Sequence, residues 1–112
     1  MPRRLVITKA GSPSVLDVID MSMPMPNEGE VCIEVHYAGI NFADTLMRLG
    51  FYQPRPPFPF TPGYEISGTI HSLGKGVTEF EVGQRVVAAM QGGGQASHVI
   101  AAVSYTHLTL PT

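Results

Sequence analysis

Hydrophobic and polar residues alternate along several short stretches of the chain, which is the pattern of β-strands with one buried face. The clearest stretch covers residues 31–38. Val31, Ile33, Val35 and Tyr37 are expected on its inner face, and they alternate with Cys32, Glu34, His36 and Ala38. Gly39 ends the pattern. This segment is therefore predicted to be a central strand.

Similar patterns predict further strands at residues 64–73, 86–90 and 96–101. At the N-terminus, apolar residues at 4–9 and 15–21 are separated by the turn signal Gly11-Ser12-Pro13, which favours a β-hairpin. The sum is about six strands, with glycine-rich turns between most of them. Such a pattern suits a small barrel or sandwich better than a parallel sheet with crossover helices.

One stretch has helical spacing instead. Over residues 42–49 the apolar side chains expected on one face are Phe42, Leu46 and Leu49. Asn41 precedes this stretch as a candidate N-cap, and Gly50 follows it as a C-terminal stop. Five prolines between positions 54 and 62 then exclude regular pairing and predict an extended loop. The fold class is therefore mainly β with one short helix.

Composition narrows the class of protein. The 112 residues are 44% hydrophobic and 14% charged with a net charge of −2, which excludes a disordered chain and gives no basic surface for nucleic acid. No apolar run approaches the ~20 residues that span a bilayer. The single cysteine, Cys32, excludes an intramolecular disulfide and fits a reducing compartment, so a cytoplasmic location is expected.

No metal site is expected. Cys32 and His36 lie on one face of the predicted strand, but their Cα atoms are ~13 Å apart at ~3.3 Å per residue, too far to share an ion. His71, His98 and His107 are isolated in the sequence. The glycine clusters at 74–76 and 92–94 lack the rest of a phosphate-binding motif, so we interpret them as turns.

Polar residues concentrate where the strand at 31–38 gives way to the helix and the proline-rich loop. These candidate site residues are Asn41, Asp44, Tyr52 and Glu65. Loops on a rigid scaffold are common places for binding sites. Spacing alone favours a purely structural interpretation, in which Asn41 caps the helix, Asp44 favours its first turn, and Tyr52 packs its ring.

Three segments carry a family resemblance. They are Ala38-Gly39-Ile40-Asn41-Phe42-Ala43-Asp44, Arg48-Leu49-Gly50-Phe51-Tyr52 and Pro57-Phe58-Pro59-Phe60-Thr61-Pro62-Gly63-Tyr64-Glu65. In this order they resemble the N-terminal part of medium-chain dehydrogenases/reductases, in the zinc-free quinone oxidoreductase (zeta-crystallin-like) branch. The resemblance implies a GroES-like, partly open β-barrel, with residues 1–103 as part of the catalytic domain.

The resemblance also implies the chemistry. Zinc-containing relatives have a cysteine at the position of Asn41 and a histidine at that of Tyr64, so no zinc is expected here. In the zinc-free branch, Asn41 and Tyr52 would line the pocket beside the nicotinamide of NADPH, with Tyr64 in the substrate pocket. NADPH would transfer hydride to a quinone or enone. No residue is assigned as an acid or base.

The same resemblance sets expectations for organisation. The family's Rossmann NADPH-binding domain is not found within these residues, and the full-length form is expected to be a homodimer. Residues 104–112 depart from the family as a non-native or divergent tail. We expect an uncovered strand edge near 86–90 and no activity from this chain alone. Two rival hypotheses are a non-catalytic, co-chaperonin-type binding module and a vesicle-associated relative of the same branch.

Overall fold

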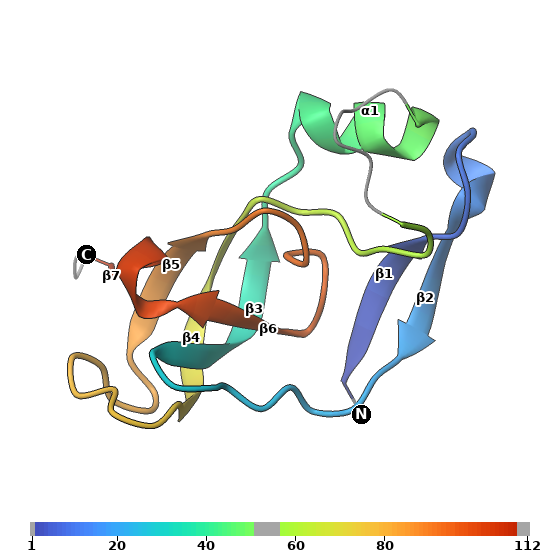
Figure 1. The fold of residues 1–112 in the computed structure, drawn as a ribbon. Helices are drawn as coiled ribbons and strands as arrows, with labels where there is room; N and C mark the ends of the chain where they lie inside the picture. Colours follow the sequence, from blue (N-terminus) through green and yellow to red (C-terminus); the bar gives the residue numbers. More distant parts are fainter. Residues whose placement is uncertain (1, 51–56, 110–112) are drawn as a thin grey trace.

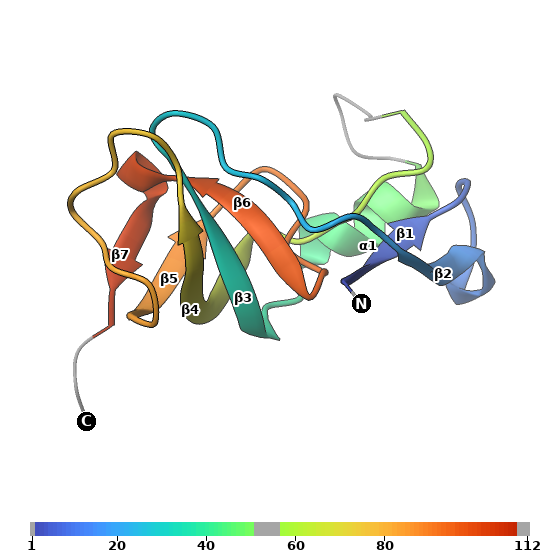
Figure 2. The same cartoon turned by 90° about the horizontal axis from the view of Figure 1, so that it is seen from below.

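The computed structural model describes residues 2–50 and 57–109, which form two antiparallel sheets and one α-helix. The smaller sheet is a hairpin of β1 (Arg3–Ile7) and β2 (Leu16–Asp20). The larger sheet has the strand order β6-β3-β4-β5-β7 and curls into a half-barrel (Figures 1 and 2). Its strands are β3 (Glu30–Ala38), β4 (Glu65–Leu73), β5 (Arg85–Ala89), β6 (His98–Ala102) and β7 (Thr106–Leu108). The described residues also contain two short 3₁₀ helices, η1 (Pro13–Val15) and η2 (Val103–Tyr105).

The main core lies inside the curled sheet. Its fully buried members include Val31, Ile33, Ile70 and Val86, which come from β3, β4 and β5. Alternation along these strands places the apolar residues on the inner face, as the sequence predicts. The mainly β, partly open barrel with one short helix is therefore confirmed. None of the helices in the described part of the chain combines the length and the apolar character needed to cross a membrane.

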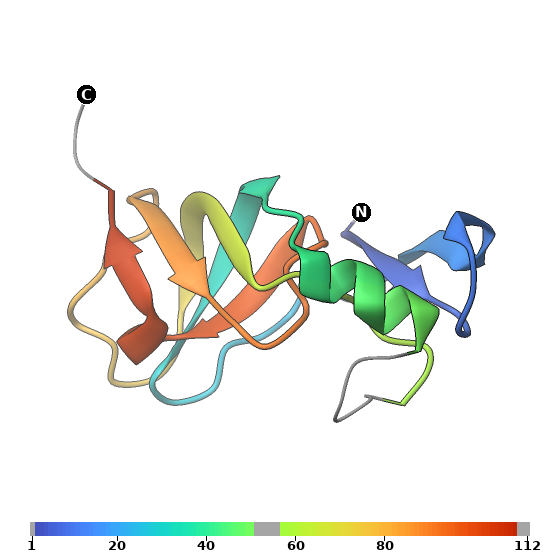
Figure 3. The ribbon, with the colours of Figure 1, turned by 90° about the horizontal axis from the view of Figure 1, so that it is seen from above.

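The helix α1 (Phe42–Leu49) has the predicted bounds. Asn41 is the N-cap with extended backbone, and Gly50 takes the left-handed conformation (φ +84°) at the C-cap. The predicted apolar face is wrong, because Phe42 is 76% exposed and the buried helix residues are Asp44 and Met47. The helix lies beside the hairpin (Figure 3), where Met47 belongs to a second small core.

Two β-bulges interrupt the pairing of β3 with β4. The register skips His71 on β4 between the pairs Cys32↔Ser72 and Ile33↔Ile70. It also skips His36 on β3, between the pairs Val35↔Gly68 and Tyr37↔Ser67. A bulge redirects the side chains that follow it. Strict alternation therefore fails along β3.

Tyr37, which follows the bulge on β3, shows this failure, because it is 78% exposed. Cys32 keeps its place on the same face as Glu34 and is nevertheless fully buried.

The C-terminal segment extends the sheet. Thr106–Leu108 forms β7 and pairs with β5 through Val86↔Leu108, Val87↔His107 and Ala88↔Thr106. The expectation of an uncovered edge at 86–90 is therefore wrong, because β7 covers that edge of β5. The described residues form seven strands rather than the expected six or so. The sequence before β7 shows no apolar alternation long enough to have indicated the strand. The departure of residues 104–112 from the family stays a prediction.

Candidate active site

A buried carboxylate holds the end of β3 against the loop that leads into β4. Asp44 is only 8% exposed. One carboxylate oxygen, Oδ2, accepts a hydrogen bond from the backbone N–H of Asn41 at 2.9 Å. The other, Oδ1, accepts one from the backbone N–H of Gly63 at 3.0 Å. One side chain thus fixes Asn41 and the residue before Tyr64 to the same point.

Gln95, in the loop before β6, makes a second set of hydrogen bonds in this region. Its side-chain Nε2 donates to the carbonyl of Gly39 at 3.0 Å, and its backbone N–H donates to the carbonyl of Pro62 at 2.9 Å. Its own carbonyl accepts from the N–H of Leu5 at 2.8 Å. The end of β3, the proline-rich loop and β1 are therefore held by one residue.

Gly63 is required by this close packing. Its φ of +117° is unfavourable for a residue with a side chain. A Cβ there would lie 2.7 Å from the backbone nitrogen of Gln95 and 2.8 Å from the Cα of Gly94. The loop that precedes Tyr64 can therefore approach the β6 loop only because this residue is glycine.

Of the three site residues that the family resemblance implies, Asn41, Tyr52 and Tyr64, the structure describes two. Asn41 and Tyr64 are both half-buried. The hydroxyl of Tyr64 lies 3.5 Å from the sulfur of Met47, and its ring packs against the small core between helix and hairpin. Tyr52 lies outside the described residues, so a cleft shared by Asn41 and Tyr52 stays a prediction.

Two hollows flank the region that Asp44 and Gln95 hold together. One of about 140 Å³ lies between α1 and the hairpin and is lined by Asp44, Thr45, Arg48 and Ile40 among others. A larger, open one of about 420 Å³ lies over β4 and β5 and includes Tyr37, Glu65 and Tyr105. Neither of these two hollows is lined by Asn41 or Tyr64. Glu65, a predicted polar residue of this region, is therefore on the larger hollow.

Sequence reasoning named Asp44 but missed its bond to Gly63, and it missed Gln95. The spacing of Asn41 and Asp44 matches a capping box, which accounts for the Asn41 contact but not for the bond to Gly63. Nothing in the sequence around Gln95 indicated its role. Because both oxygens of Asp44 accept backbone N–H groups, we interpret Asp44 as a positioning residue.

Two ionisable groups have shifted pKa values with clear causes. Burial raises the pKa of the Cys32 thiol, and a hydrogen bond with the Ser72 side chain offsets part of this rise. Cys32 is therefore a protonated thiol near neutral pH and a poor nucleophile or metal ligand. Burial, together with nearby His71, lowers the pKa of His98, although Glu34 acts in the opposite direction. The expectation that His71 and His98 are isolated is wrong, since their ring centroids are 5.0 Å apart.

A curled half-barrel sheet with a capped helix at the end of its central strand defines the class of this domain. Residues 27–108 match the model of the alcohol dehydrogenase GroES-like domain, and the chain belongs to that family. It is 36% identical over 111 residues to a quinone oxidoreductase of Lama guanicoe, covering 97% of this chain and 33% of that protein. A human quinone oxidoreductase is 34% identical, with the same two coverages. The chain thus spans about a third of the length of these curated relatives.

Solved structures show the same likeness. The human synaptic vesicle membrane protein VAT-1 homolog-like protein superposes with a TM-score of 0.93 at 33% identity, over 96% of this chain and 34% of that one. An Escherichia coli quinone oxidoreductase solved in complex with NADPH gives a TM-score of 0.85 at 32% identity, over 97% of this chain and 33% of its own. The relatives of this chain are therefore oxidoreductases as well as a vesicle membrane protein homologue.

Proposed function

We propose that this chain is the catalytic-domain part of a zinc-independent, NADPH-dependent oxidoreductase that acts on quinones or enones. The observation that supports it most is the double anchoring by Asp44, which holds Asn41 and the residue before Tyr64 in place. These are the positions where zinc-containing relatives carry a cysteine and a histidine. An amide and a phenol there are suited to hydrogen bonding rather than to binding zinc.

The cofactor is NADPH in this proposal, and it supplies the hydride when bound. Its pyrophosphate needs free backbone N–H groups at a helix N-terminus. Within residues 2–50 and 57–109 the one α-helix is α1, and its start already carries a capping box in which the Asp44 carboxylate accepts from the N–H of Asn41. We therefore assign to this chain the nicotinamide end and the substrate, with Asn41 and Tyr52 orienting ribose and carbonyl oxygens and Tyr64 lining the substrate pocket.

Two features of the whole protein belong to the same proposal. The full-length form is a homodimer, as the family resemblance implies. Its location is cytoplasmic, which is supported by the single, buried cysteine Cys32.

A second candidate is a vesicle-associated relative of the same branch, and the TM-score of 0.93 to the VAT-1 homolog-like protein supports it. A co-chaperonin-type binding module receives less support, because the matching family model is that of alcohol dehydrogenases. The oxidoreductase and the vesicle-associated relative differ in enzymatic activity, so an assay separates them.

The absence of a catalytic zinc ion is directly measurable. After dialysis against metal-free buffer, the protein should retain far less than one zinc ion per chain, because Asn41 and Tyr64 provide neither thiolate nor imidazole. Elemental analysis by mass spectrometry is the measurement. One zinc ion per chain that survives dialysis, and that Asn41→Ala removes, would show that this position does bind the metal.

The activity itself is tested in a chimeric protein, called the joined protein below. Residues 1–103 replace the matching N-terminal third of the E. coli quinone oxidoreductase, and NADPH oxidation is followed with a small quinone. Asn41→Ala in this protein should lower kcat/KM roughly tenfold, the value of about one lost hydrogen bond to a reacting group. Asn27→Ala, at an exposed position, is the matched control and should leave kcat/KM unchanged.

A further inference from the structure

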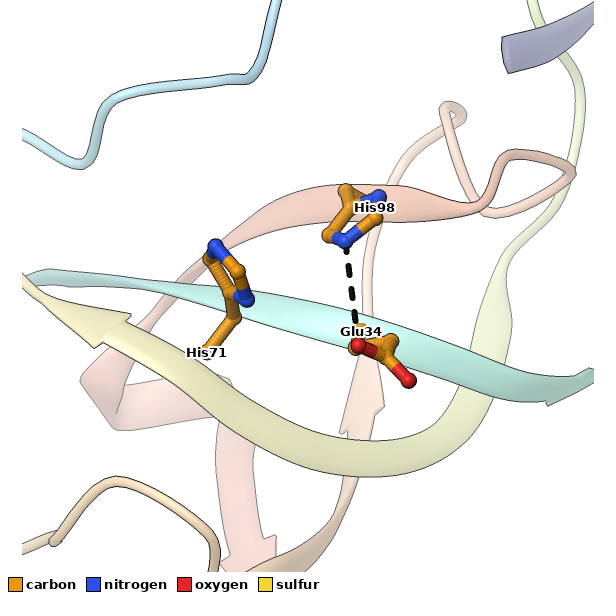
Figure 4. Close-up of side chains that lie close together, drawn as sticks. All are labelled: Glu34, His71 and His98. Atoms are coloured by element: carbon orange, nitrogen blue, oxygen red, sulfur yellow. Dashed lines mark ion pairs between the residues drawn. The ribbon is translucent and has the colours of Figure 1, made fainter. Parts of the chain in front are cut away.

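Three potential metal ligands converge on the outer face of the larger sheet. Glu34, His71 and His98 come from the neighbouring strands β3, β4 and β6 (Figure 4). One ligand atom from each lies within 4.8 Å of the other two. Their sequence separation, from 34 to 98, explains why they look unrelated along the chain. This cluster is separate from the residues assigned to the oxidoreductase site.

The strand register explains the convergence. Glu34 on β3 lies directly opposite His98 on β6, and directly opposed residues project from the same face of a sheet. On the other side, β4 contributes His71, which is the residue skipped by one of the two bulges. The imidazoles therefore flank Glu34 from both neighbouring strands. Their rings meet edge to face at 77°.

The ring nitrogens are suitably oriented for an ion. His98 Nδ1 lies 3.0 Å from the Ser97 hydroxyl, which leaves Nε2 toward Glu34 Oε2 at 3.9 Å. Such an outer hydrogen bond is the usual way in which a metal-binding histidine is held in place. A further imidazole, that of His36, lies 3.8 Å from Glu34 Oε1 and belongs to the second bulge. His36 contacts Glu34 alone in this way, and the ligand atoms that lie within 4.8 Å of one another are those of Glu34, His71 and His98.

The spacing is close to what a zinc ion requires. Ligand atoms at about 2.0–2.1 Å from a tetrahedral ion lie roughly 3.4 Å from one another. The present separations of up to 4.8 Å need a closure of little more than 1 Å, within reach of side-chain rotation, since Glu34 is exposed. Two imidazoles and one carboxylate favour zinc and similar transition ions, whereas magnesium and calcium prefer oxygen ligands alone.

We propose that Glu34, His71 and His98 bind a divalent transition-metal ion of the zinc type on the outer face of the sheet, with water completing the coordination. The site is mostly exposed and its ligands are not closed around an ion, so it fills when zinc is added and empties on dialysis. An ion bound there links β6, β3 and β4 across three strands. It therefore stabilises the folded chain increasingly as its concentration rises.

Titration of the full 112-residue chain with zinc in an isothermal titration calorimeter tests the proposal. We expect one saturable zinc site per chain and no binding of magnesium at the same concentrations. His71→Ala and Glu34→Gln should each weaken zinc binding at least about tenfold, the lower end of the effect of removing a ligand or its support. His107→Ala, an exposed histidine on β7, is the matched control and should bind zinc as the original chain does.

Circular dichroism shows whether each variant is folded. Should His71→Ala fail to fold, the nearly isosteric Glu34→Gln at an exposed position decides the outcome. The proposal is wrong if the original chain shows no saturable zinc binding. It is equally wrong if the folded variants keep the original affinity, or if His107→Ala loses as much affinity as they do.

Discussion

Gly68→Val should abolish the cooperative folding of this chain or lower its free energy of unfolding by more than about 3 kcal/mol, the upper range of ordinary overpacking. Gly68 lies in β4 opposite Val35. A Cβ at this position would collide with the backbone carbonyl oxygen of Glu34 and lie 3.0 Å from the Ile33 side chain. Backbone atoms of a central strand cannot move aside without breaking the pairing of β3 with β4.

Thermal and urea unfolding followed by circular dichroism measure this effect. Thr69→Val is the matched control, because it places the same side chain at the next, half-buried position of the same strand. It should change stability by less than about 1 kcal/mol, the range over which strand propensities differ. A Gly68→Val protein as stable as the Thr69→Val protein would show that β3 and β4 are not packed as described.

Asp44→Ala is expected to have the second largest effect, a loss of about 2–5 kcal/mol in the free energy of unfolding. The substitution leaves the N–H groups of Asn41 and Gly63 without their acceptor, and each buried orphaned donor costs about 1–3 kcal/mol. Asp44→Asn keeps one acceptor oxygen and should lose about half as much. Both losses come from the region that positions Asn41.

Urea denaturation of the two variants beside Asp20→Ala provides the measurement. Asp20 is an exposed residue at the end of β2, so its substitution should change the free energy of unfolding by less than about 0.5 kcal/mol. Should Asp44→Ala prove as mild as Asp20→Ala, the carboxylate would not hold the two segments together.

The parts of the fold that were predicted correctly depend on neighbouring residues. Asn41 and Gly50 delimit α1 because capping and left-handed stops are set within one helical turn. The central strands follow from apolar alternation, and the hairpin follows from two apolar stretches separated by a turn signal. By contrast, the buried side of α1 is set by the hairpin, through Ile7 and Val15, and short-range spacing does not contain that information.

Long-range pairing explains what was missed. β7 is a strand only because β5 is available to pair with it. The bond from Asp44 to Gly63 spans 19 positions, and the one from Gln95 to Gly39 spans 56. Asn41 and Asp44 were named as candidate site residues from the sequence, and their role in a site stays a prediction, whereas Gln95 and the bond between Asp44 and Gly63 were missed. The meeting of His71 with His98 likewise depends on the strand order β6-β3-β4.

NADPH oxidation with a small quinone is the most direct measurement of the proposed function, with near-ultraviolet absorbance as the readout. The protein that joins residues 1–103 to the remainder of the E. coli quinone oxidoreductase should oxidise NADPH steadily, whereas the 112-residue chain alone should not. Folding and NADPH binding of the joined protein are verified first. Steady NADPH oxidation by the chain alone, or a folded, NADPH-binding joined protein that leaves the quinone unreduced, would contradict the proposal.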